Sequence, residues 1–300
     1  MKKIGYMKKT IKIGLIGNKY HVLLLQRQLK SRGIEALNLI DNVNFNAIRE
    51  IEVLHSLWGL GDKKAILIAN LLKKKIIMHW IGTDAYSVIK RLKYRIIAMI
   101  SNLFVSKNVA ISDNITKELH DIGFDIETVP FISEAVGTEI MPLPKTFSIA
   151  TYIPDDRSEF YGRKWVYDLA KVFPETIFYV VSGEGGKIIN KPSNIKYLGH
   201  VNDINEIFKK ASLFLRLTEH DGLSHLVLEA LARGRNVLWT IPFPHCYHAI
   251  NFDNSRIIID HLKLNHEINY KGANYVKEKY DQNIVLNGII NMYCSVLGNK

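Results

Sequence analysis

Cysteine is scarce in this chain. Of its 300 residues only Cys246 and Cys294 are cysteines, and they lie far apart in the sequence. Their spacing matches neither a disulfide framework nor a zinc motif, and two isolated thiols suit a reducing compartment. The composition therefore predicts a cytoplasmic protein that is not held together by disulfides.

Long apolar runs are also lacking. No stretch reaches the roughly 18 consecutive apolar residues that a membrane-spanning helix needs, and there is no internal repeat or low-complexity tract. Even so, 47% of the residues are hydrophobic, which is ample for two buried cores, and 300 residues is a typical length for two domains. We expect a globular chain with two domains.

Acidic residues are too few to balance the basic ones, and the formal net charge is +11. Residues 1–145 hold 22 basic and 13 acidic side chains, a net charge of +9, whereas residues 146–300 hold 18 and 16. A one-sided basic field favours polyanions. Because no zinc-finger spacing and no RNA-binding signature of aromatic and basic residues accompanies it, we expect no nucleic-acid partner. An anionic membrane surface is the favoured partner, with solubility alone as the alternative.

The most informative stretch runs from Asp221 to Gly234 and reads Asp-Gly-Leu-Ser-His-Leu-Val-Leu-Glu-Ala-Leu-Ala-Arg-Gly. An apolar strand is predicted before it at 211–218, and another after it at 237–240. A helix begins at Ser224 or His225, and the glycine at its end suits a left-handed helix stop. The order strand, loop, helix, strand is half of a doubly wound nucleotide-binding fold.

In such folds the loop after a parallel strand lies where ligands bind, and the free amides at the start of the next helix favour a phosphate. Asp221 lies in that loop and Glu229 about one turn into the helix. Two carboxylates therefore flank one predicted anion-binding site. One carboxylate can accept hydrogen bonds from sugar hydroxyls and the other from a ribose. The alternative is that Asp221 is a turn residue and Glu229 a solvated helix residue.

This stretch resembles the donor-site signature of the retaining glycosyltransferases of family 4. That signature has two acids separated by seven residues, followed by a pattern like Glu-Ala-Leu-Ala-x-Gly. Asp221 and Glu229 match the two acids, with Asp221 where many members have Glu. The resemblance implies an α/β protein of GT-B fold, with two Rossmann-like doubly wound parallel-sheet domains that face each other across a cleft. It also implies that Glu229 holds the ribose and Asp221 the donor sugar.

The remaining donor residues are predicted around this signature. Amides of Gly222, Leu223, Ser224 and His225 would bind the diphosphate. Arg157 and Lys164, in and after a polar loop, match basic residues with which family members clamp the diphosphate, although Arg163 is an alternative to Lys164. A glycine-rich loop at 183–186, in which Gly183 is the candidate, allows close approach of a base or ribose.

Metal binding is not expected. The adjacent acids Asp155 and Asp156 are followed directly by Arg157, which makes a poor Mg²⁺ site. An enzyme of this fold neutralises the leaving diphosphate with basic side chains and helix amides instead.

The first domain opens with a strand, a glycine loop and a helix, but Gly14 and Gly17 lack the third glycine of a dinucleotide fingerprint. The segment 17–19 remains a candidate for the acceptor side. A later loop, His-Trp-Ile-Gly-Thr-Asp at 79–84, is similar to a His-x-x-Gly-Thr-Asp pattern of family 4. It makes His79 a candidate catalytic residue and Asp84 a candidate for binding the donor at the cleft, although a histidine at a strand end is more often structural.

One predicted helix, at 87–107, combines an apolar stripe with basic residues near its start. We expect the stripe to pack on the sheet. The basic end can rest on anionic lipid headgroups, which predicts peripheral association with the inner face of the cell membrane.

Taken together, the sequence predicts an N-terminal acceptor-side domain at 1–140, to which the C-terminal helix returns, and a donor-binding domain at 146–300. The predicted activity is transfer of a sugar from a UDP- or GDP-sugar to a glycan or lipid-linked acceptor, with retention of configuration and no tightly bound cofactor. A sugar-nucleotide epimerase of the same fold and a non-catalytic nucleotide- or lipid-binding protein remain the alternatives.

Overall fold

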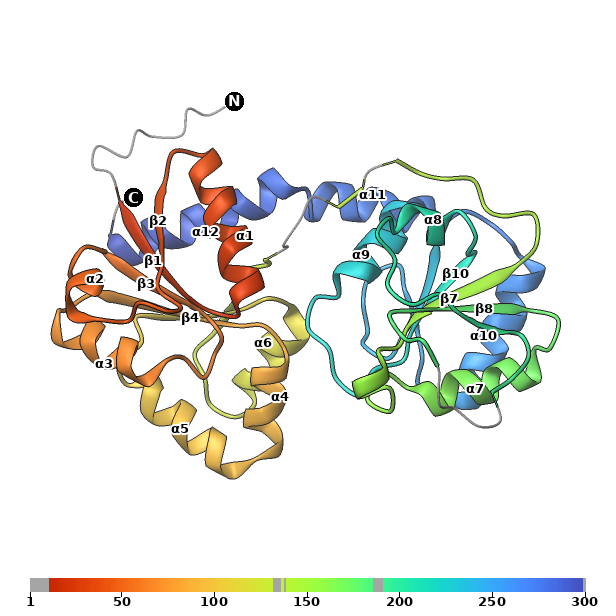
Figure 1. The fold of residues 1–300 in the computed structure, drawn as a ribbon, viewed down its shortest axis with the longest axis horizontal. Helices are drawn as coiled ribbons and strands as arrows, with labels where there is room; N and C mark the ends of the chain where they lie inside the picture. The colour runs from red at the N-terminus through yellow and green to blue at the C-terminus, as the bar shows by residue number, and fades with distance from the viewer. Residues whose placement is uncertain (1–10, 132–135, 138, 186–190, 299–300) are drawn as a thin grey trace. The chain divides into compact units, whose positions relative to one another are not determined.

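In the computed structural model the chain divides into two compact units, each built around its own parallel sheet. The structure describes residues 11–131, 136–137, 139–185 and 191–298. Unit 1 comprises residues 1–134 together with 282–300, and unit 2 comprises residues 135–281. In each unit, helices cover both faces of the sheet (Figure 1).

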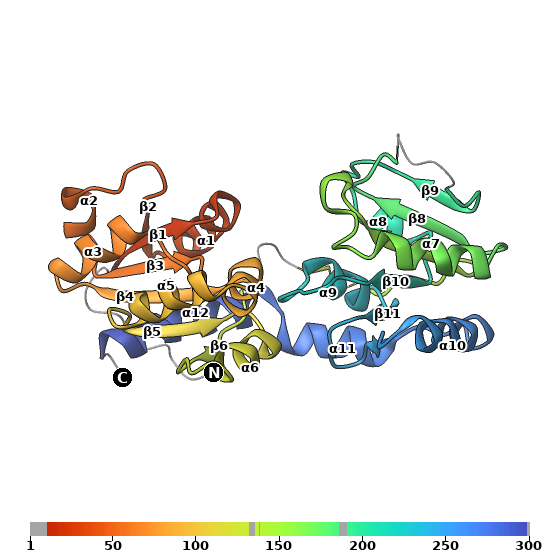
Figure 2. The same ribbon diagram turned by 90° about the horizontal axis from the view of Figure 1, so that it is seen from below.

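Unit 1 has a six-stranded sheet in the order β2-β1-β3-β4-β5-β6, with all neighbours parallel. Figure 2 shows β1, β3, β4, β5 and β6 following one another across this sheet. The strands are β1 (Lys12–Gly17), β2 (Glu35–Asn38), β3 (Val53–Leu57), β4 (Lys75–Trp80), β5 (Lys107–Ala110) and β6 (Glu127–Thr128). The helices are α1 (Lys19–Ser31), α2 (Phe45–Arg49), α3 (Lys63–Leu71), α4 (Thr83–Lys90), α5 (Leu92–Asn102), α6 (Asp113–His120) and, from the end of the chain, α12 (Gln282–Leu297).

Unit 2 has a second six-stranded parallel sheet, in the order β12-β11-β10-β7-β8-β9. Its strands are β7 (Ser148–Tyr152), β8 (Ile177–Val181), β9 (Ile195–Tyr197), β10 (Leu213–Arg216), β11 (Asn236–Trp239) and β12 (Tyr247–His248). Its helices are the short 3₁₀ turn η1 (Asp155–Arg157), α7 (Arg163–Val172), α8 (Asn205–Phe208), α9 (His225–Ala232), α10 (Phe252–Leu264) and α11 (Tyr270–Lys279).

The predicted order of strand, loop, helix and strand around residues 221–234 is confirmed by β10, α9 and β11. Ser224 is the N-cap residue of α9, and Gly234 has the positive φ of +74° that the predicted helix stop requires. Apolar residues drive this arrangement, because Val227, Leu228 and Leu231 of α9 are fully buried.

The C-terminal helix α12 packs within unit 1, although unit 2 precedes it in the chain. It buries Leu286, Ile289 and Tyr293, and its Asn283 accepts a hydrogen bond of 2.8 Å from the guanidinium of Arg32 in unit 1. No helix in the described part of the chain is long and apolar enough to cross a membrane.

The structure differs from the prediction at 87–107, where two helices replace one. Arg91 has extended backbone (φ −130°, ψ 112°), which ends α4 and starts α5. Of the residues of α5 only Ala98 is buried, whereas Ile96, Met99 and Ile100 are each at least half exposed. The expectation that this apolar stripe packs on the sheet is therefore wrong for α5, because the break turns the second helix away from the packing of the first.

Candidate functional site

The sheet of unit 2 changes winding direction between β7 and β10. These strands are neighbours, yet β7 is followed by β8 on one side and β10 by β11 on the other. Ligands of open α/β sheets bind beside the carboxyl ends of the strands at such a switch point. The loops that follow β7 and β10 are therefore the first place to look for a ligand site.

These two loops contact each other. The amide of Glu219, after β10, donates to the carbonyl oxygen of Phe160, after β7, at 3.0 Å. The guanidinium of Arg216 lies over the ring of Tyr161, 4.9 Å from its centroid. A single surface thus carries residues from both loops.

Asp221 is held by a residue that the sequence reasoning missed. The Nε atom of Arg216, the last residue of β10, donates to Asp221 Oδ2 at 2.6 Å, and the amide of Gly222 donates to Oδ1 at 3.1 Å. Burial lowers the pKa of Arg216, but the charge of Asp221 and the hydrogen bond to it outweigh this effect and raise the pKa. A signal existed, since an arginine inside an otherwise apolar buried strand needs a partner.

Glu229 lies on α9 and is buried. One carboxylate oxygen pairs with Arg233 and accepts a bond of 3.3 Å from the amide of Gly137, and the other is 3.1 Å from His225 Nε2. Burial raises the pKa of Glu229, but the hydrogen bond from His225 and the charge of Arg233 hold it below its ordinary value. The carboxylate is therefore ionised at neutral pH and positioned by a basic residue one turn away.

The loop before α9 brings the predicted diphosphate-binding amides to the start of that helix. Gly222 and Ser224 are buried, whereas Leu223 and His225 are partly exposed. The carbonyl oxygen of Ser224 accepts from the amides of Val227 and Leu228, which starts the helical ladder. The amide dipoles at this helix start favour an anion.

The basic residues after β7 differ in their solvent exposure and in their ion-pair partners. Arg157 is exposed and its guanidinium stacks on Phe160, 4.5 Å from the ring centroid. Arg163 pairs with Glu159, whereas the side chain of Lys164 is 83% exposed and its ammonium is 2.6 Å from Asp168. Lys164 also lines a cavity of about 490 Å³ at the carboxyl ends of β10 and β11, which Thr218 and Thr240 help to form.

The glycine loop after β8 is attached to the loop after β7 through Asp155. Its carboxylate accepts from the amides of Glu184 at 3.0 Å and Gly185 at 3.4 Å. Gly183 lies so close to β7 that a Cβ atom there would be 2.6 Å from the carbonyl oxygen of Ile153. Gly186, at the end of this predicted loop, lies outside the described residues.

The two predicted cleft residues of unit 1 are buried instead. His79 and His55 have no exposed surface, and they form a chain of hydrogen bonds with Tyr293. The successive distances are 2.7 Å from Tyr293 Oη to His55 Nδ1, 3.2 Å from His55 Nε2 to His79 Nδ1, and 3.0 Å from His79 Nε2 to the carbonyl oxygen of Val129.

A carbonyl can only accept a hydrogen bond, so His79 Nε2 carries its proton and Nδ1 accepts from His55. Burial lowers the pKa of His79 to about 3, and burial together with His79 lowers the pKa of His55 well below its ordinary value. Both rings are therefore neutral. This arrangement gives His79 a structural role that attaches β3, β4 and α12 to one another.

Asp84 is also fully buried. Its carboxylate accepts from the backbone amides of Gly59 at 2.6 Å, Gly82 at 2.7 Å, Ala85 at 3.0 Å and Ile81 at 3.1 Å. Burial raises the pKa of Asp84, and these amides only partly oppose that effect. The side chain fastens the loop after β3 to the loop after β4, and the structure gives no support for a role in binding the donor.

Unit 1 has a cavity at its own switch point, between β1 and β3. It has a volume of about 410 Å³, and its lining includes Gly17 and Asn18 after β1 and Trp58 and Gly61 after β3. The predicted acceptor-side segment 17–19 therefore contributes to a cavity where a ligand of this fold class is expected.

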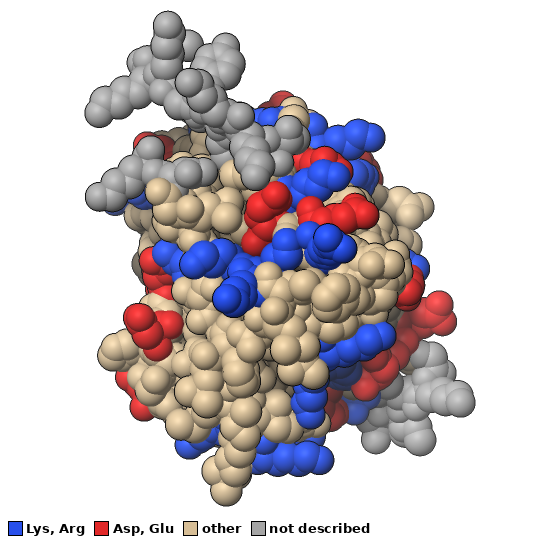
Figure 3. All heavy atoms as spheres, turned by 90° about the vertical axis from the view of Figure 1, so that its left-hand side faces the viewer, with Lys and Arg blue, Asp and Glu red and all other residues tan. Residues whose placement is uncertain are grey.

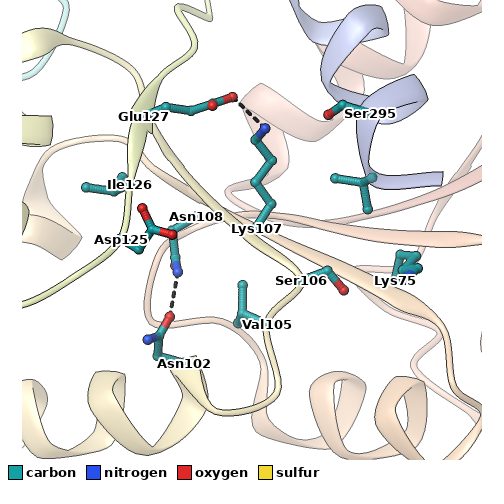
Figure 4. A pocket seen from close by; sticks show the side chains of 11 residues that line it. Lys75, Asn102, Val105, Ser106, Lys107, Asn108, Asp125, Ile126, Glu127 and Ser295 are labelled. Carbon is teal, nitrogen blue, oxygen red and sulfur yellow. Dashed lines mark hydrogen bonds and ion pairs between the residues drawn. The ribbon is translucent and has the colours of Figure 1, made fainter. Parts of the chain in front are cut away.

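A larger cavity, of about 560 Å³, lies at the opposite edge of the same sheet (Figure 4). It is lined by Lys75, Lys107 and Glu127, which begin β4, β5 and β6. Lys107 and Glu127 form an ion pair of 2.8 Å there. This cavity is at the amino ends of the strands, and none of the predicted site residues lines it.

No group of three or more His, Cys, Asp and Glu side chains within the described ranges is arranged to hold a metal ion. Asp155, one of the two adjacent acids, is instead engaged with backbone amides of the glycine loop.

Comparison with known proteins places this geometry in a known fold. No protein-family model matches the chain, and no curated protein matches its sequence. Among solved structures, Anabaena HepE in complex with UDP is similar with a TM-score of 0.73 at 12% identity, covering 95% of this chain and 100% of that one.

Two further structures have the same architecture. The lipopolysaccharide outer core galactosyltransferase WaaB has a TM-score of 0.68 at 12% identity and covers 95% of this chain and 99% of its own. The sucrose-phosphate synthase of Thermosynechococcus elongatus has a TM-score of 0.73 at 10% identity, with 97% and 100% covered. The predicted fold class is thereby confirmed: the chain has the GT-B fold of these glycosyltransferases, with two Rossmann-like units.

Proposed function

We propose that the chain is a glycosyltransferase that uses a nucleotide-diphosphate sugar as its donor. The observation that carries this proposal is the switch-point surface of unit 2, which combines exposed basic side chains, a helix start and two fixed carboxylates. The similarity to HepE, which has been crystallised with UDP and with UDP-glucose, supports a donor of this class.

In the proposed reaction, the bond between the anomeric carbon and the diphosphate oxygen breaks, and a bond from an acceptor oxygen to that carbon forms. Arg157 and Lys164, with the amides at the start of α9, stabilise the negative charge that develops on the leaving diphosphate. Asp221 binds hydroxyls of the donor sugar, and Glu229 binds the ribose. The acceptor hydroxyl gives its proton to the departing diphosphate oxygen.

Retention of configuration is part of this proposal. It rests on the match of Asp221 and Glu229 to the family 4 signature. No side chain is assigned as a covalent nucleophile, so attack from the face of the leaving group is the expected course. Following the anomeric proton coupling of the first product by NMR tests this point, because an inverted product would rule it out.

The acceptor is proposed to be a glycan or a lipid-linked glycan that binds to unit 1. The cavity between β1 and β3, with Asn18 and Trp58 in its lining, is the proposed acceptor subsite. Polar and aromatic side chains together suit a sugar, which presents both hydroxyl groups and apolar ring faces.

The experiment that tests the activity is donor hydrolysis with UDP-, GDP- and ADP-sugars, read as released nucleotide diphosphate. Arg157→Ala and Glu229→Ala are each expected to raise the donor KM. Conversion of the donor to another sugar nucleotide without any acceptor would identify an epimerase instead. Lack of turnover together with lack of a donor-induced thermal shift would leave a binding protein.

We also propose that the transfer needs no divalent metal, since basic side chains and helix amides are available to neutralise the diphosphate. Turnover in the presence of EDTA is expected to equal turnover without it. Complete loss of turnover that Mg²⁺ restores would contradict this part of the proposal.

A further inference from the structure

The second helix of the 87–107 segment, α5, forms with α3 an exposed apolar surface on unit 1. We define the α3–α5 face by six side chains, each at least half exposed: Leu67, Leu71, Ile96, Met99, Ile100 and Leu103. Between the two helices runs a groove of about 360 Å³ that Ile66, Ile97 and Phe104 also line. Soluble proteins rarely expose so many large apolar side chains together unless the surface binds something.

The charges around this face are mostly positive. Residues 63–104, which span α3, α4 and α5, contain nine lysines and arginines and one acidic residue, the fully buried Asp84, while the exposed Asp62 precedes α3. Lys63, Lys64, Lys90, Arg91 and Lys93 are exposed. Figure 3 shows a broad tan area in the lower half of this side of the molecule, with blue Lys and Arg side chains at its lower and right-hand edges and red Asp or Glu side chains at its left-hand edge.

We infer that the α3–α5 face binds the surface of an anionic lipid bilayer. The apolar side chains would enter the region between headgroups and acyl chains, while the cations stay at the level of the phosphates. Each lysine or arginine near an anionic membrane surface adds to the attraction. The inference rests on the face itself and not on the proposed transferase activity.

A second copy of the chain fits this face less well. In a two-fold symmetric dimer the same patch meets itself, so Lys90, Arg91 and Lys93 of one copy would approach those of the other. The repulsion between these charges opposes such a contact. Asp62, before α3, is the one exposed acidic residue at positions 62–104, which is too few to compensate for it.

The test is flotation of the purified full chain, without donor, on phosphatidylcholine vesicles with and without phosphatidylglycerol. We expect the protein to float with the anionic vesicles and increasing salt to release it. Met99→Ser/Leu103→Ser is expected to lower the partition coefficient about tenfold or more, because two apolar side chains no longer enter the lipid. Lys90→Gln and Lys93→Gln are expected to lower it about fivefold each.

Matched controls come from unit 2. Leu264, 86% exposed on α10, matches the 79% exposed Leu103, and the exposed Lys277 and Lys279 of α11 match Lys90 and Lys93. Leu264→Ser and Lys277→Gln/Lys279→Gln are expected to float like the unmodified chain. Because all these positions are exposed, the variants should keep the thermal unfolding midpoint of the parent, which is checked in the same preparations.

Three outcomes would overturn the inference. The first is failure of the unmodified chain to float with anionic vesicles. The second is equal loss of flotation in the variants of unit 1 and in the controls. The third is a dimer in size-exclusion chromatography that Met99→Ser/Leu103→Ser converts to a monomer, which would make this face an interface between copies. Donor hydrolysis is measured separately, so loss of the transferase activity and loss of lipid binding can be told apart.

Discussion

Arg216 donates a hydrogen bond of 2.6 Å from Nε to Asp221 Oδ2, and this ion pair joins the end of β10 to the loop that leads into α9. The two side chains are only 10% and 16% exposed. An ion pair with so little solvent contact fixes the direction of its carboxylate. In the proposed enzyme Arg216 is therefore a positioning residue, which orients Asp221 toward the donor sugar.

Replacing Arg216 by methionine should have two separable effects. Removal of one partner leaves the mostly buried carboxylate of Asp221 without the charge of Arg216, so we expect the free energy of unfolding to fall by about 3 kcal/mol. Arg216→Met/Asp221→Asn should recover much of that loss but not the turnover, because the oriented carboxylate is gone. Urea unfolding and donor hydrolysis measure the two effects. Full turnover in the double variant would show that Asp221 does not bind the donor.

The regular elements of unit 2 were predictable because hydrophobic periodicity reports them directly. The run at 211–218 gave β10, and the segment ending at Gly234 gave α9, each within about two residues of its bounds. Spacing along the chain also selected Asp221 and Glu229 as candidate donor residues, which stays a prediction. It did not lead to Arg216 as the partner of Asp221, because charge pairing inside a strand end has no fixed spacing.

The sequence was less informative about what covers a residue. His79 ends a strand whether that end is open or closed, and only the fold brings Tyr293, 214 positions away, into its hydrogen-bonded chain with His55. Similarly, the apolar period of α5 is the same for a helix that faces the core and one that faces solvent. Burial of such residues depends on long-range contacts, which a local pattern does not contain.

The buried histidines should make unit 1 sensitive to mild acid. The pKa values of both His55 and His79 are lowered by folding, so the unfolded chain binds more protons below its own histidine pKa of about 6.5. Stability is then fully present above that pH and is lost as the pH falls below it. We expect a loss of about 1.4 kcal/mol per pH unit for each histidine.

Urea unfolding at neutral pH and near pH 5 measures this loss for the unmodified chain and for His79→Gln. The variant is less stable at neutral pH, since its hydrogen bonds are imperfect, but it should lose less on acidification because one titrating ring is gone. His261→Gln, in α10 of unit 2, is the control and should behave as the parent. An equal pH dependence in all three proteins would contradict the neutral histidine pair.

Substitutions at Asp84 distinguish a structural role of this residue from a role in binding the donor. Its carboxylate accepts from four backbone amides, and alanine at this position leaves them without an acceptor in a buried place. We expect Asp84→Ala to lower the free energy of unfolding by about 3 kcal/mol or more, and Asp84→Asn to lower it less. The donor KM of Asp84→Asn should equal that of the parent. A large increase in this KM with unchanged stability would restore the donor-binding role predicted from the sequence.

Lys164 and Lys171 allow the proposed diphosphate contact to be separated from ordinary surface charge. Both are exposed residues of α7, and both pair with Asp168, Lys164 at 2.6 Å and Lys171 at 3.1 Å. Only Lys164 lies at the start of the helix, beside the loop that carries Arg157, and it lines the cavity at the carboxyl ends of β10 and β11. Substituting either lysine lowers the net charge and removes an ion pair with Asp168. Only Lys164 is placed to contact a diphosphate.

We therefore expect Lys164→Ala to raise the donor KM by roughly tenfold or more, as loss of a charge-assisted hydrogen bond would, and Lys171→Ala to leave it unchanged. Arg163→Ala decides between the two basic residues that the sequence left open, and we expect a smaller effect because Arg163 is engaged with Glu159. Saturation curves for the donor, measured at several salt concentrations, provide the values. If Lys171→Ala raised the KM as much as Lys164→Ala, the effect would be one of general charge, and the diphosphate contact would have to be assigned to Arg157 and the amides of α9 alone.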